Sequence, residues 1–260
     1  MPELPDVETF RRYLDATALH RKIRDVRVRH TGVLTGISPR RLKQALVRTS
    51  FEATDRHGKY LFVKTGRSAW LVLHFGMTGF LEYGKDRQAG AHDRVIFDFE
   101  NGFSLAYICT RLLGKVTLAK SPAQFARRVH LGPDALGIDP EGFRSRFLGS
   151  RASVKSCLMN QERIAGVGNI YSDEILFQSR LPPALKSNKL TARQIGQLYR
   201  KARHVLSMAA DRKAEPAHMP ASWLLPNRDE GAACPRCGRA IEKTKVAGRS
   251  AYWCPHCQKA

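Results

Sequence analysis

Cys234-Pro235-Arg236-Cys237 and Cys254-Pro255-His256-Cys257 are two Cys-x-x-Cys motifs separated by sixteen residues. At this spacing, two tight turns on a short hairpin place four thiolates around one tetrahedral zinc ion. Two redox-active cysteine pairs are the alternative, but no thioredoxin-like βαβ pattern surrounds them. Four thiolates leave no open coordination position. We therefore expect one structural Zn²⁺ in a small ribbon that folds only with its metal, with the ligands Cys234, Cys237, Cys254 and Cys257.

The chain that precedes this ribbon divides into a strand-rich and a helix-rich part. Pro5, followed by apolar residues at helical spacing up to Ala18, predicts an opening helix. Asn101-Gly102 indicates a hairpin turn between two strands, and from Ile195 to Ala209 the apolar residues follow a period near 3.6. The expected fold is α+β, with domains at 1–121, 122–225 and 226–260. The clearest predicted strands are Tyr60–Lys64, Ala69–Phe75, Arg94–Phe99 and Phe103–Tyr107.

The charge balance points to an anionic partner. Lys and Arg number 44 against 23 Asp and Glu, a formal net charge of +21. Nucleic acid is favoured, because neutralising phosphates releases counterions; an anionic membrane surface, or mere solubility, are the alternatives. No apolar run approaches the roughly 18 residues of a membrane span, and the charged first twenty residues are unlike a signal peptide. We expect a cytoplasmic protein without membrane contact.

The N-terminus carries a candidate nucleophile. Met1-Pro2-Glu3 favours removal of Met1, which would expose Pro2 as a secondary amine. An α-amino group titrates near roughly pH 8, so more of it is neutral and nucleophilic than of lysine. Attack on a sugar anomeric carbon would give an iminium that acts as an electron sink, with Glu3 as general acid and base. The alternative is an ordinary Met-Pro start, with Glu3 favouring the helix N-terminus.

Gly166-Val167-Gly168-Asn169-Ile170-Tyr171 is a candidate phosphate-binding turn. Two glycines permit unusual backbone angles and close approach to a ligand, and the helix that begins near Asn169 directs free N–H groups toward it. Asn169 can cap that helix or donate from its amide. A simple turn between two helices is the alternative. In the ribbon, Arg249 follows a glycine at a hairpin tip, where it can grip a phosphate or remain a solvated arginine.

Together these motifs, in this order, resemble the formamidopyrimidine-DNA glycosylase and endonuclease VIII family of DNA repair enzymes. The resemblance covers nearly the whole chain. It implies an N-terminal helix on a β-sandwich in residues 1–121, a helix–two-turns–helix domain in 122–225 and a zinc ribbon in 226–260. It further implies a monomer that binds damaged or abasic double-stranded DNA, in the cytoplasm of a bacterial-type cell and associated with its nucleoid.

The resemblance also implies residue roles. Pro2 would form the Schiff base and Glu3 would protonate the sugar ring oxygen. Lys59 and Arg249 would bind phosphates around the extruded nucleotide as part of the catalytic group, and Met77 would fill the gap left by the flipped base. Further DNA contacts are expected from His74, Asn169 and Tyr171, and from the wedge loop Arg111, Leu112 and Leu113.

The wedge loop departs from the family pattern. The family usually has Arg-Arg-Phe-Gly where this chain has Arg111-Leu112-Leu113-Gly114. An apolar wedge can fill a base stack, but it cannot donate hydrogen bonds to the opposite base. We therefore expect weak discrimination of the opposite base.

The resulting hypothesis is a bifunctional DNA glycosylase and AP lyase for oxidised bases, with β/δ-elimination. Pro2-Glu3-Leu4-Pro5 favours oxidised purines, such as formamidopyrimidines and 8-oxoguanine, while Trp253-Cys254-Pro255 looks closer to the pyrimidine-specific endonuclease VIII branch. Two other classes stay open: a non-catalytic binder of damaged DNA, and a zinc-ribbon accessory factor of transcription or translation, which would leave the N-terminal motif unexplained.

Overall fold

A computed structural model describes residues 2–259, which form two compact units. Unit 1 is Pro2 with Asp6–Val129, and unit 2 is Glu3–Pro5 with residues 130–259. These divisions differ from the expected domain boundaries after residues 121 and 225. The segment just after residue 121 groups with the strands because Phe125 packs on Phe62, and the cysteine-rich ribbon groups with the helices because Ile241 shares a buried cluster with Phe177.

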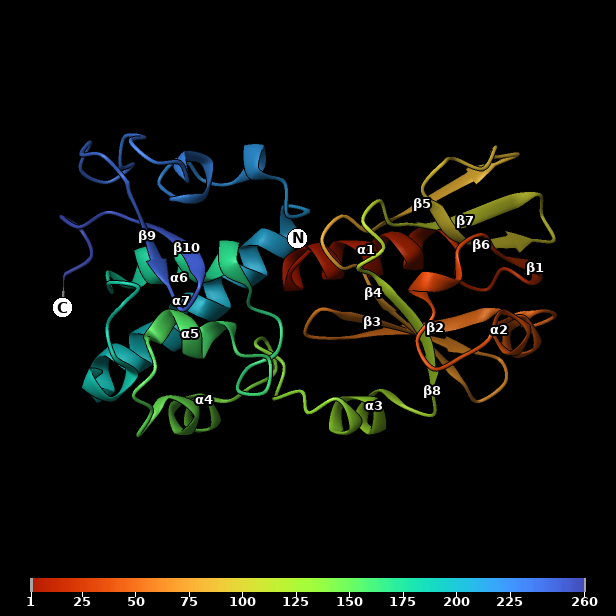
Figure 1. The fold of residues 1–260 in the computed structure, drawn as a ribbon, viewed down its shortest axis with the longest axis horizontal. Coiled ribbons are helices and arrows are strands. Elements are labelled where there is room, and N and C mark those ends of the chain that lie inside the picture. The colour runs from red at the N-terminus through yellow and green to blue at the C-terminus, as the bar shows by residue number, and fades with distance from the viewer. Residues whose placement is uncertain (1, 260) are drawn as a thin grey trace. The chain divides into compact units, whose positions relative to one another are not determined.

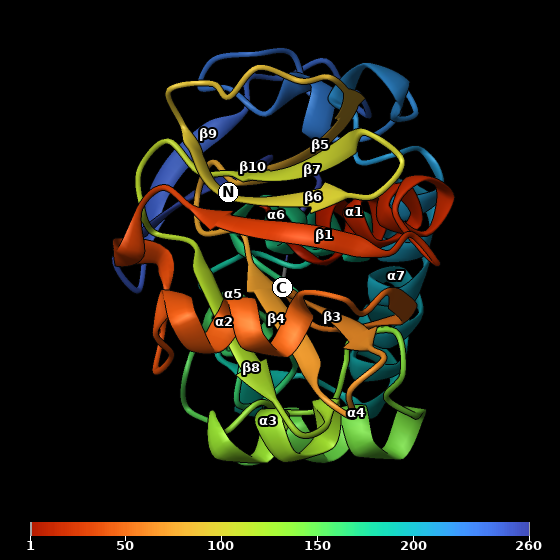
Figure 2. The same ribbon diagram turned by 90° about the vertical axis from the view of Figure 1, so that its right-hand side faces the viewer.

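Unit 1 is a sandwich of two four-stranded antiparallel sheets, ordered β1-β6-β7-β5 and β2-β3-β4-β8 (Figures 1 and 2). Its helices are α1 (Leu4–Thr17, whose first residues belong to unit 2), α2 (Pro39–Leu46) and α3 (Pro122–Arg128). The strands of the first sheet are β1 (Ile23–Val28), β5 (Phe80–Lys85), β6 (Asp93–Phe99) and β7 (Phe103–Ile108). Those of the second are β2 (Phe51–His57), β3 (Tyr60–Thr65), β4 (Trp70–His74) and β8 (Lys115–Ala119).

Aromatic side chains close the space between the two sheets. The ring of Phe51 on β2 lies 5.5 Å from that of Phe97 and 6.0 Å from that of Phe99, both on β6. All three are fully buried, as expected when alternate residues of each strand face one core. The four predicted strands are confirmed as β3, β4, β6 and β7, and Gly102 adopts the positive φ of 81° in the β6–β7 hairpin.

Unit 2 packs four helices around one core: α4 (Pro140–Phe147), α5 (Val154–Met159), α6 (Asn169–Ser179) and α7 (Ala192–Asp211). Thr191 and Gln194 form a capping box at the start of α7, and the apolar face predicted from Ile195 onward is buried. Short 3₁₀ turns follow at Pro216–His218 and Leu225–Asn227, before the ribbon hairpin β9 (Glu242–Val246) and β10 (Arg249–Trp253). No helix within residues 2–259 is long and apolar enough to cross a membrane.

Glu174 is a buried carboxyl group that anchors the segment between α7 and the ribbon. It is 1% exposed; its Oε2 accepts a hydrogen bond from the backbone N–H of Leu225 at 2.7 Å and its Oε1 accepts one from Nε2 of Gln178 at 2.7 Å. Burial raises the pKa of Glu174 to about 7, although its hydrogen bonds and the positive charge of Arg236 oppose the shift. A proton on this carboxyl group therefore stabilises the folded unit.

We expect Glu174→Gln to remove one pH dependence of stability. A folded-state pKa near 7, above the unfolded value of 4.5, gives a stabilising contribution that is complete below about pH 4.5 and lost as the pH rises through 7. The loss is on the order of 3 kcal/mol. Denaturant unfolding between about pH 5 and pH 8 should show this decline in the native chain and not in Glu174→Gln. The exposed Glu162→Gln is the control, and equal declines in all three chains would contradict the assignment.

Candidate functional site

Glu3 is seated at the N-terminus of α6. Its carboxylate accepts hydrogen bonds from the backbone N–H groups of Gly168 at 2.6 Å, Ile170 at 2.8 Å and Tyr171 at 3.2 Å. The side chain is 1% exposed, and Leu4 N donates to Gly166 O at 3.0 Å. Three backbone donors and the positive end of the helix dipole favour a negatively charged carboxylate. The sequence predicted a phosphate at this turn, and the chain's own Glu3 occupies these N–H groups instead.

Two glycines make room for this seat. A Cβ added at Gly168 would lie 2.3 Å from Cδ of Glu3, which no side chain tolerates. Gly166 has a φ of +119°, and a Cβ there would lie 2.6 Å from Cδ1 of Leu4. Both glycines therefore allow a close approach to the backbone, but the groups that approach are Glu3 and Leu4 of the chain itself and not the ligand that the sequence suggested.

Asn169 and Tyr171 flank this seat in ways that the sequence did not indicate. The N-cap of α6 is Gly168, so of the two roles considered for Asn169 the helix cap is not the one observed. Asn169 Oδ1 is buried and has no hydrogen-bond partner among residues 2–259. Tyr171 is 3% exposed and belongs to the core cluster of unit 2, and its backbone N–H donates to Glu3.

A buried ionic network, which the sequence analysis missed, joins this helix to the ribbon. Lys155 Nζ donates to Asn169 O at 3.2 Å and pairs with Oδ1 of Asp173. Oδ2 of Asp173 accepts from Arg228 Nη2 at 2.8 Å and from the backbone N–H of Tyr252 on β10 at 3.2 Å. Lys155 and Asp173 are almost completely buried, where a broken pair would leave an uncompensated charge. Lys155 lies among the buried apolar residues Val154 and Leu158 of α5. A lysine among apolar residues was the sequence signal that could have indicated a buried ion pair.

The predicted residues of unit 1 gather at one end of the second sheet. Lys59 lies in the β2–β3 turn and is 9% exposed, and His74 is the last residue of β4, paired with Lys115 on β8. Burial, together with the positive charges of Lys115 and Lys59, lowers the pKa of His74 to about 4. The imidazole is therefore neutral at neutral pH, and its Nδ1 accepts from Gly76 N at 3.3 Å.

Met77 and the wedge loop lie together beyond this sheet end. A Cβ added at Gly76 would lie 2.5 Å from the backbone carbon of Leu113, and Nη1 of Arg111 approaches Sδ of Met77 at 3.7 Å. Met77 is 41% and Leu113 53% exposed, whereas Leu112 has a φ of +56° and packs against the unit's core. Met77 and Leu113 therefore present two exposed apolar side chains on loops whose backbones pack together. Of the two leucines, Leu113 is the one presented outward.

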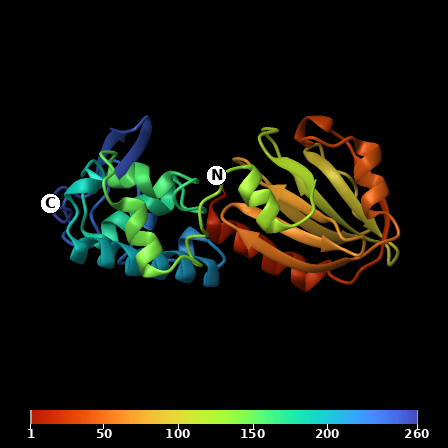
Figure 3. The ribbon, with the colours of Figure 1, turned by 90° about the horizontal axis from the view of Figure 1, so that it is seen from below.

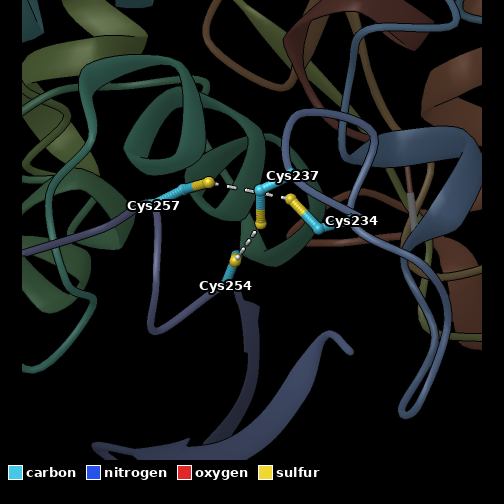
Figure 4. Close-up of side chains that lie close together, drawn as sticks. All are labelled: Cys234, Cys237, Cys254 and Cys257. Carbon is cyan, nitrogen blue, oxygen red and sulfur yellow. Dashed lines mark hydrogen bonds between the residues drawn. The ribbon is translucent and has the colours of Figure 1, made fainter. Parts of the chain in front are cut away.

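The four ribbon cysteines fit a tetrahedral zinc ion (Figure 4). Sγ atoms lie 3.9 Å apart for Cys234 and Cys257 and 3.6 Å apart for Cys237 and Cys254, and all four lie within 4.8 Å of one another. Zn–S bonds of about 2.3 Å in a tetrahedron require S···S separations of about 3.8 Å. The site therefore suits one structural Zn²⁺ with no open coordination position.

The hairpin above this site presents Arg249. Ala247 and Gly248, with φ of 48° and 76°, form the two-residue turn between β9 and β10, and Arg249 pairs with Val246 as the first residue after it. Positive φ at both central residues matches a turn whose twist suits the flanking strands. Arg249 is exposed at the hairpin tip, as the sequence predicted.

We expect Cys254→Ser to remove the zinc and unfold the ribbon, because a small hairpin depends on its metal for folding. The native chain should release one zinc ion per molecule when its thiols are modified in the presence of a chromophoric chelator. The control is Cys157→Ala, which lies in the core of unit 2 away from the ribbon and should keep the zinc. A zinc-loaded, folded Cys254→Ser protein would refute the four-thiolate site.

Three family models match the chain in succession. They are the formamidopyrimidine-DNA glycosylase N-terminal domain over residues 1–116, the formamidopyrimidine-DNA glycosylase H2TH domain over residues 131–219 and the zinc finger found in FPG and IleRS over residues 231–260. The matches follow the order of strands, helices and ribbon described above.

Similar proteins extend over the whole chain. The formamidopyrimidine-DNA glycosylase of Pelotomaculum thermopropionicum is 36% identical, with 100% of this chain and 99% of that protein covered. That of Laribacter hongkongensis is 32% identical over 100% of both chains. Crystal structures of Lactococcus lactis Fpg (MutM) with DNA containing N7-benzyl-Fapy-dG, and with abasic-site DNA, give TM-scores of 0.90 and 0.89 at 28% identity, covering 100% and 99% of this chain and 100% of each neighbour. The chain belongs to the formamidopyrimidine-DNA glycosylase family.

Proposed function

We propose that this chain is a bifunctional DNA glycosylase and AP lyase of base excision repair, acting on double-stranded DNA with damaged bases or abasic sites. The observation that carries the proposal is the Glu3 seat at the start of α6, with Pro2 as the preceding residue. A carboxylate fixed by three backbone N–H groups, one residue from a potential secondary amine, is what this chemistry requires.

The N-terminal nitrogen is the proposed nucleophile. Removal of Met1, which lies outside the described residues, is required to free it. The Pro2 nitrogen then bonds to C1′ of the deoxyribose, the glycosidic bond breaks and the base departs with the bonding electrons. The iminium formed from a secondary amine keeps its positive charge. It promotes loss of a C2′ proton and elimination of the 3′ phosphate, and then of the 5′ phosphate.

Glu3 is proposed to move the proton that balances this step. Attack by the amine releases the proton on nitrogen, and opening of the sugar requires one on the ring oxygen. A carboxylate that begins ionised, as the three donors to Glu3 favour, accepts the first proton and delivers it to O4′. Glu3 therefore acts as base first and acid second.

The basic side chains are proposed to hold the phosphates around the lesion. Lys59 and the exposed Arg249 supply positive charge, and Asn169 would donate a hydrogen bond to a phosphate from its side-chain NH₂ group. The neutral imidazole of His74 contributes hydrogen bonding without adding charge. Such contacts offset the few kcal/mol that turning a nucleotide out of the stack costs.

Met77 and Leu113 are proposed to fill the space left by the extruded nucleotide, since both are exposed and lie on adjoining loops. Apolar side chains inserted between base steps occupy a stack without hydrogen-bonding to it. Arg111 remains at the edge of this pair. The opposite base is therefore read weakly.

Oxidised purines such as formamidopyrimidines and 8-oxoguanine are the proposed lesions, because all three family models and the similar proteins carry the formamidopyrimidine or FPG name. The alternative is removal of oxidised pyrimidines, which a panel of lesions would reveal. We further propose that the protein works as a monomer, in the cytoplasm and on the nucleoid.

Borohydride trapping tests the nucleophile. Reduction of the iminium should link the native chain covalently to abasic or lesion DNA. Pro2→Gly should lower base removal and strand cleavage while leaving DNA binding near native, because the secondary amine is lost and the phosphate contacts remain. A chain with an extra residue ahead of Pro2 should not be trapped at all. Full trapping of that extended chain would overturn the Pro2 assignment.

Truncation of the exposed wedge tests its proposed role. Leu113→Ala should slow base removal from duplex DNA by about tenfold, since filling the stack supplies on the order of 1–2 kcal/mol, and by equal factors opposite all four bases. Cleavage of an abasic single strand should stay unchanged. Leu148→Ala, which truncates a leucine that is 52% exposed in unit 2, is the matched control. A change that depends on the opposite base would contradict an apolar wedge.

A further inference from the structure

Unit 1 contains a hollow that lies away from the predicted DNA-contacting residues His74, Met77 and Leu113. It has a volume of about 910 Å³ and is lined by α2, the turn between β3 and β4, the end of β8 and α3. Figures 2 and 3 show α3 on the outer side of the β2-β3-β4-β8 sheet, whereas Leu42 and Leu46 of α2 belong to the core between the two sheets. Neither the family matches nor the proposed chemistry gives this hollow a role.

Four positive side chains surround the hollow: Arg41 from α2, Lys120 after β8, and Arg127 and Arg128 from α3. All four are exposed, and the described residues that line the hollow include no Asp or Glu. Within residues 2–259 none of the four forms an ion pair, whereas many other cations of unit 1, such as Arg27 with Asp98, do. Like charges gathered without a counter-charge repel one another and attract an anion.

The lining of the hollow is mainly apolar, with Gln44, Ser68 and Gln124 as its uncharged polar residues. Leu118 and Ala119 from β8, Ala45 from α2 and Ala69 before β4 contribute carbon surface beneath the charges. The guanidinium of Arg128 lies 5.2 Å from the ring centre of Phe125, which holds one of the four charges at the rim. A pocket with an apolar interior and a charged rim suits a peptide segment that inserts an apolar side chain into the interior and places charged side chains on the rim.

The strand register separates this hollow from the proposed DNA contacts. β4 and β8 pair from Trp70 with Ala119 at one end to His74 with Lys115 at the other. Ala119 lines the hollow, whereas His74 leads into the loop of Met77. At about 3.3 Å per residue, the two ends of these strands are roughly 13 Å apart. A ligand in the hollow therefore leaves the other sheet end accessible.

We propose that this hollow, between α2 and α3, binds an acidic segment of a partner protein, with an apolar side chain of that segment in the hollow and its carboxylates on Arg41, Lys120, Arg127 and Arg128. A nucleic acid fits the same surface less well. The ring of Phe125 is 5% exposed, so it offers no face for base stacking, and a single concave hollow does not follow an extended phosphate backbone. The segment's negative charge matches the unpaired cations, and its apolar side chain matches the interior.

Fluorescence anisotropy of the full zinc-loaded chain, without DNA, tests this proposal. The probe is a labelled short peptide in which aspartates alternate with leucine or phenylalanine. We expect saturable binding. Arg41→Glu/Arg127→Glu should weaken it by about tenfold or more, because two positive charges at the rim become negative. Added salt should weaken it as well. The charge-matched control Arg21→Glu/Arg24→Glu, exposed near β1 on the other sheet, should bind as the native chain does.

Ala45→Trp separates the hollow from general charge attraction. The indole fills the hollow and keeps every positive charge, so we expect binding to fall by about tenfold when an apolar side chain must enter there. The proposal would be overturned if the native and Ala45→Trp chains bound the peptide equally, or if both double variants lost the same affinity. It would also be overturned if a peptide with alanine at the apolar positions bound as well as the original peptide. So would a loss of duplex or single-stranded DNA affinity in Arg41→Glu/Arg127→Glu that matches its loss of peptide affinity. These readouts use neither Pro2 nor lesion DNA, so they succeed or fail independently of the proposed repair activity.

Discussion

The carboxylate of Glu3 at the N-terminus of α6 is the interaction on which the functional arrangement of this protein depends. It satisfies backbone N–H groups that a helix start otherwise leaves without partners, and it fixes the residue that follows Pro2. The same contact explains Gly168, where any side chain would overlap the carboxylate. One local constraint therefore sets the position of the proposed acid and base and restricts where the proposed nucleophilic nitrogen can lie.

A buried network extends this constraint to the zinc ribbon. Lys155 and Asp173 form a pair beneath the first turn of α6, and Asp173 also receives Arg228 and the backbone of Tyr252 on the ribbon strand. Charges this deeply buried are tolerated because each has partners, and removal of Asp173 would leave the buried ammonium of Lys155 without its paired carboxylate. The hairpin that presents Arg249 is thereby attached to the helix that seats Glu3, and zinc is needed to keep that hairpin folded.

Two surfaces of unit 1 lie at opposite ends of the paired strands β4 and β8. At one end, neutral His74 and the exposed Met77 and Leu113 offer uncharged side chains to unstacked bases, with the positive charges of Lys59 and Lys115 close to His74. At the other end, the hollow beneath Arg41 and Arg127 concentrates positive charge over carbon. Some of the basic residues therefore surround the proposed lesion site, and others surround the proposed second binding surface.

The sequence alone determined the features that depend on short-range spacing. The cysteine spacing defined the zinc site, because its ligands lie on two local turns; alternation and helical periodicity defined the main strands and helices; and motif order identified the family. Tertiary structure alone decided what fills the turn before Asn169, which leucine of the wedge faces outward, and that Lys155 joins Asp173. The physical reason is that a helix N-terminus can bind different anions and a buried charge can pair with different opposite charges. Lys155 and Asp173 are 18 positions apart, and Glu3 and Gly168 are 165 positions apart, so folding decides which partners meet.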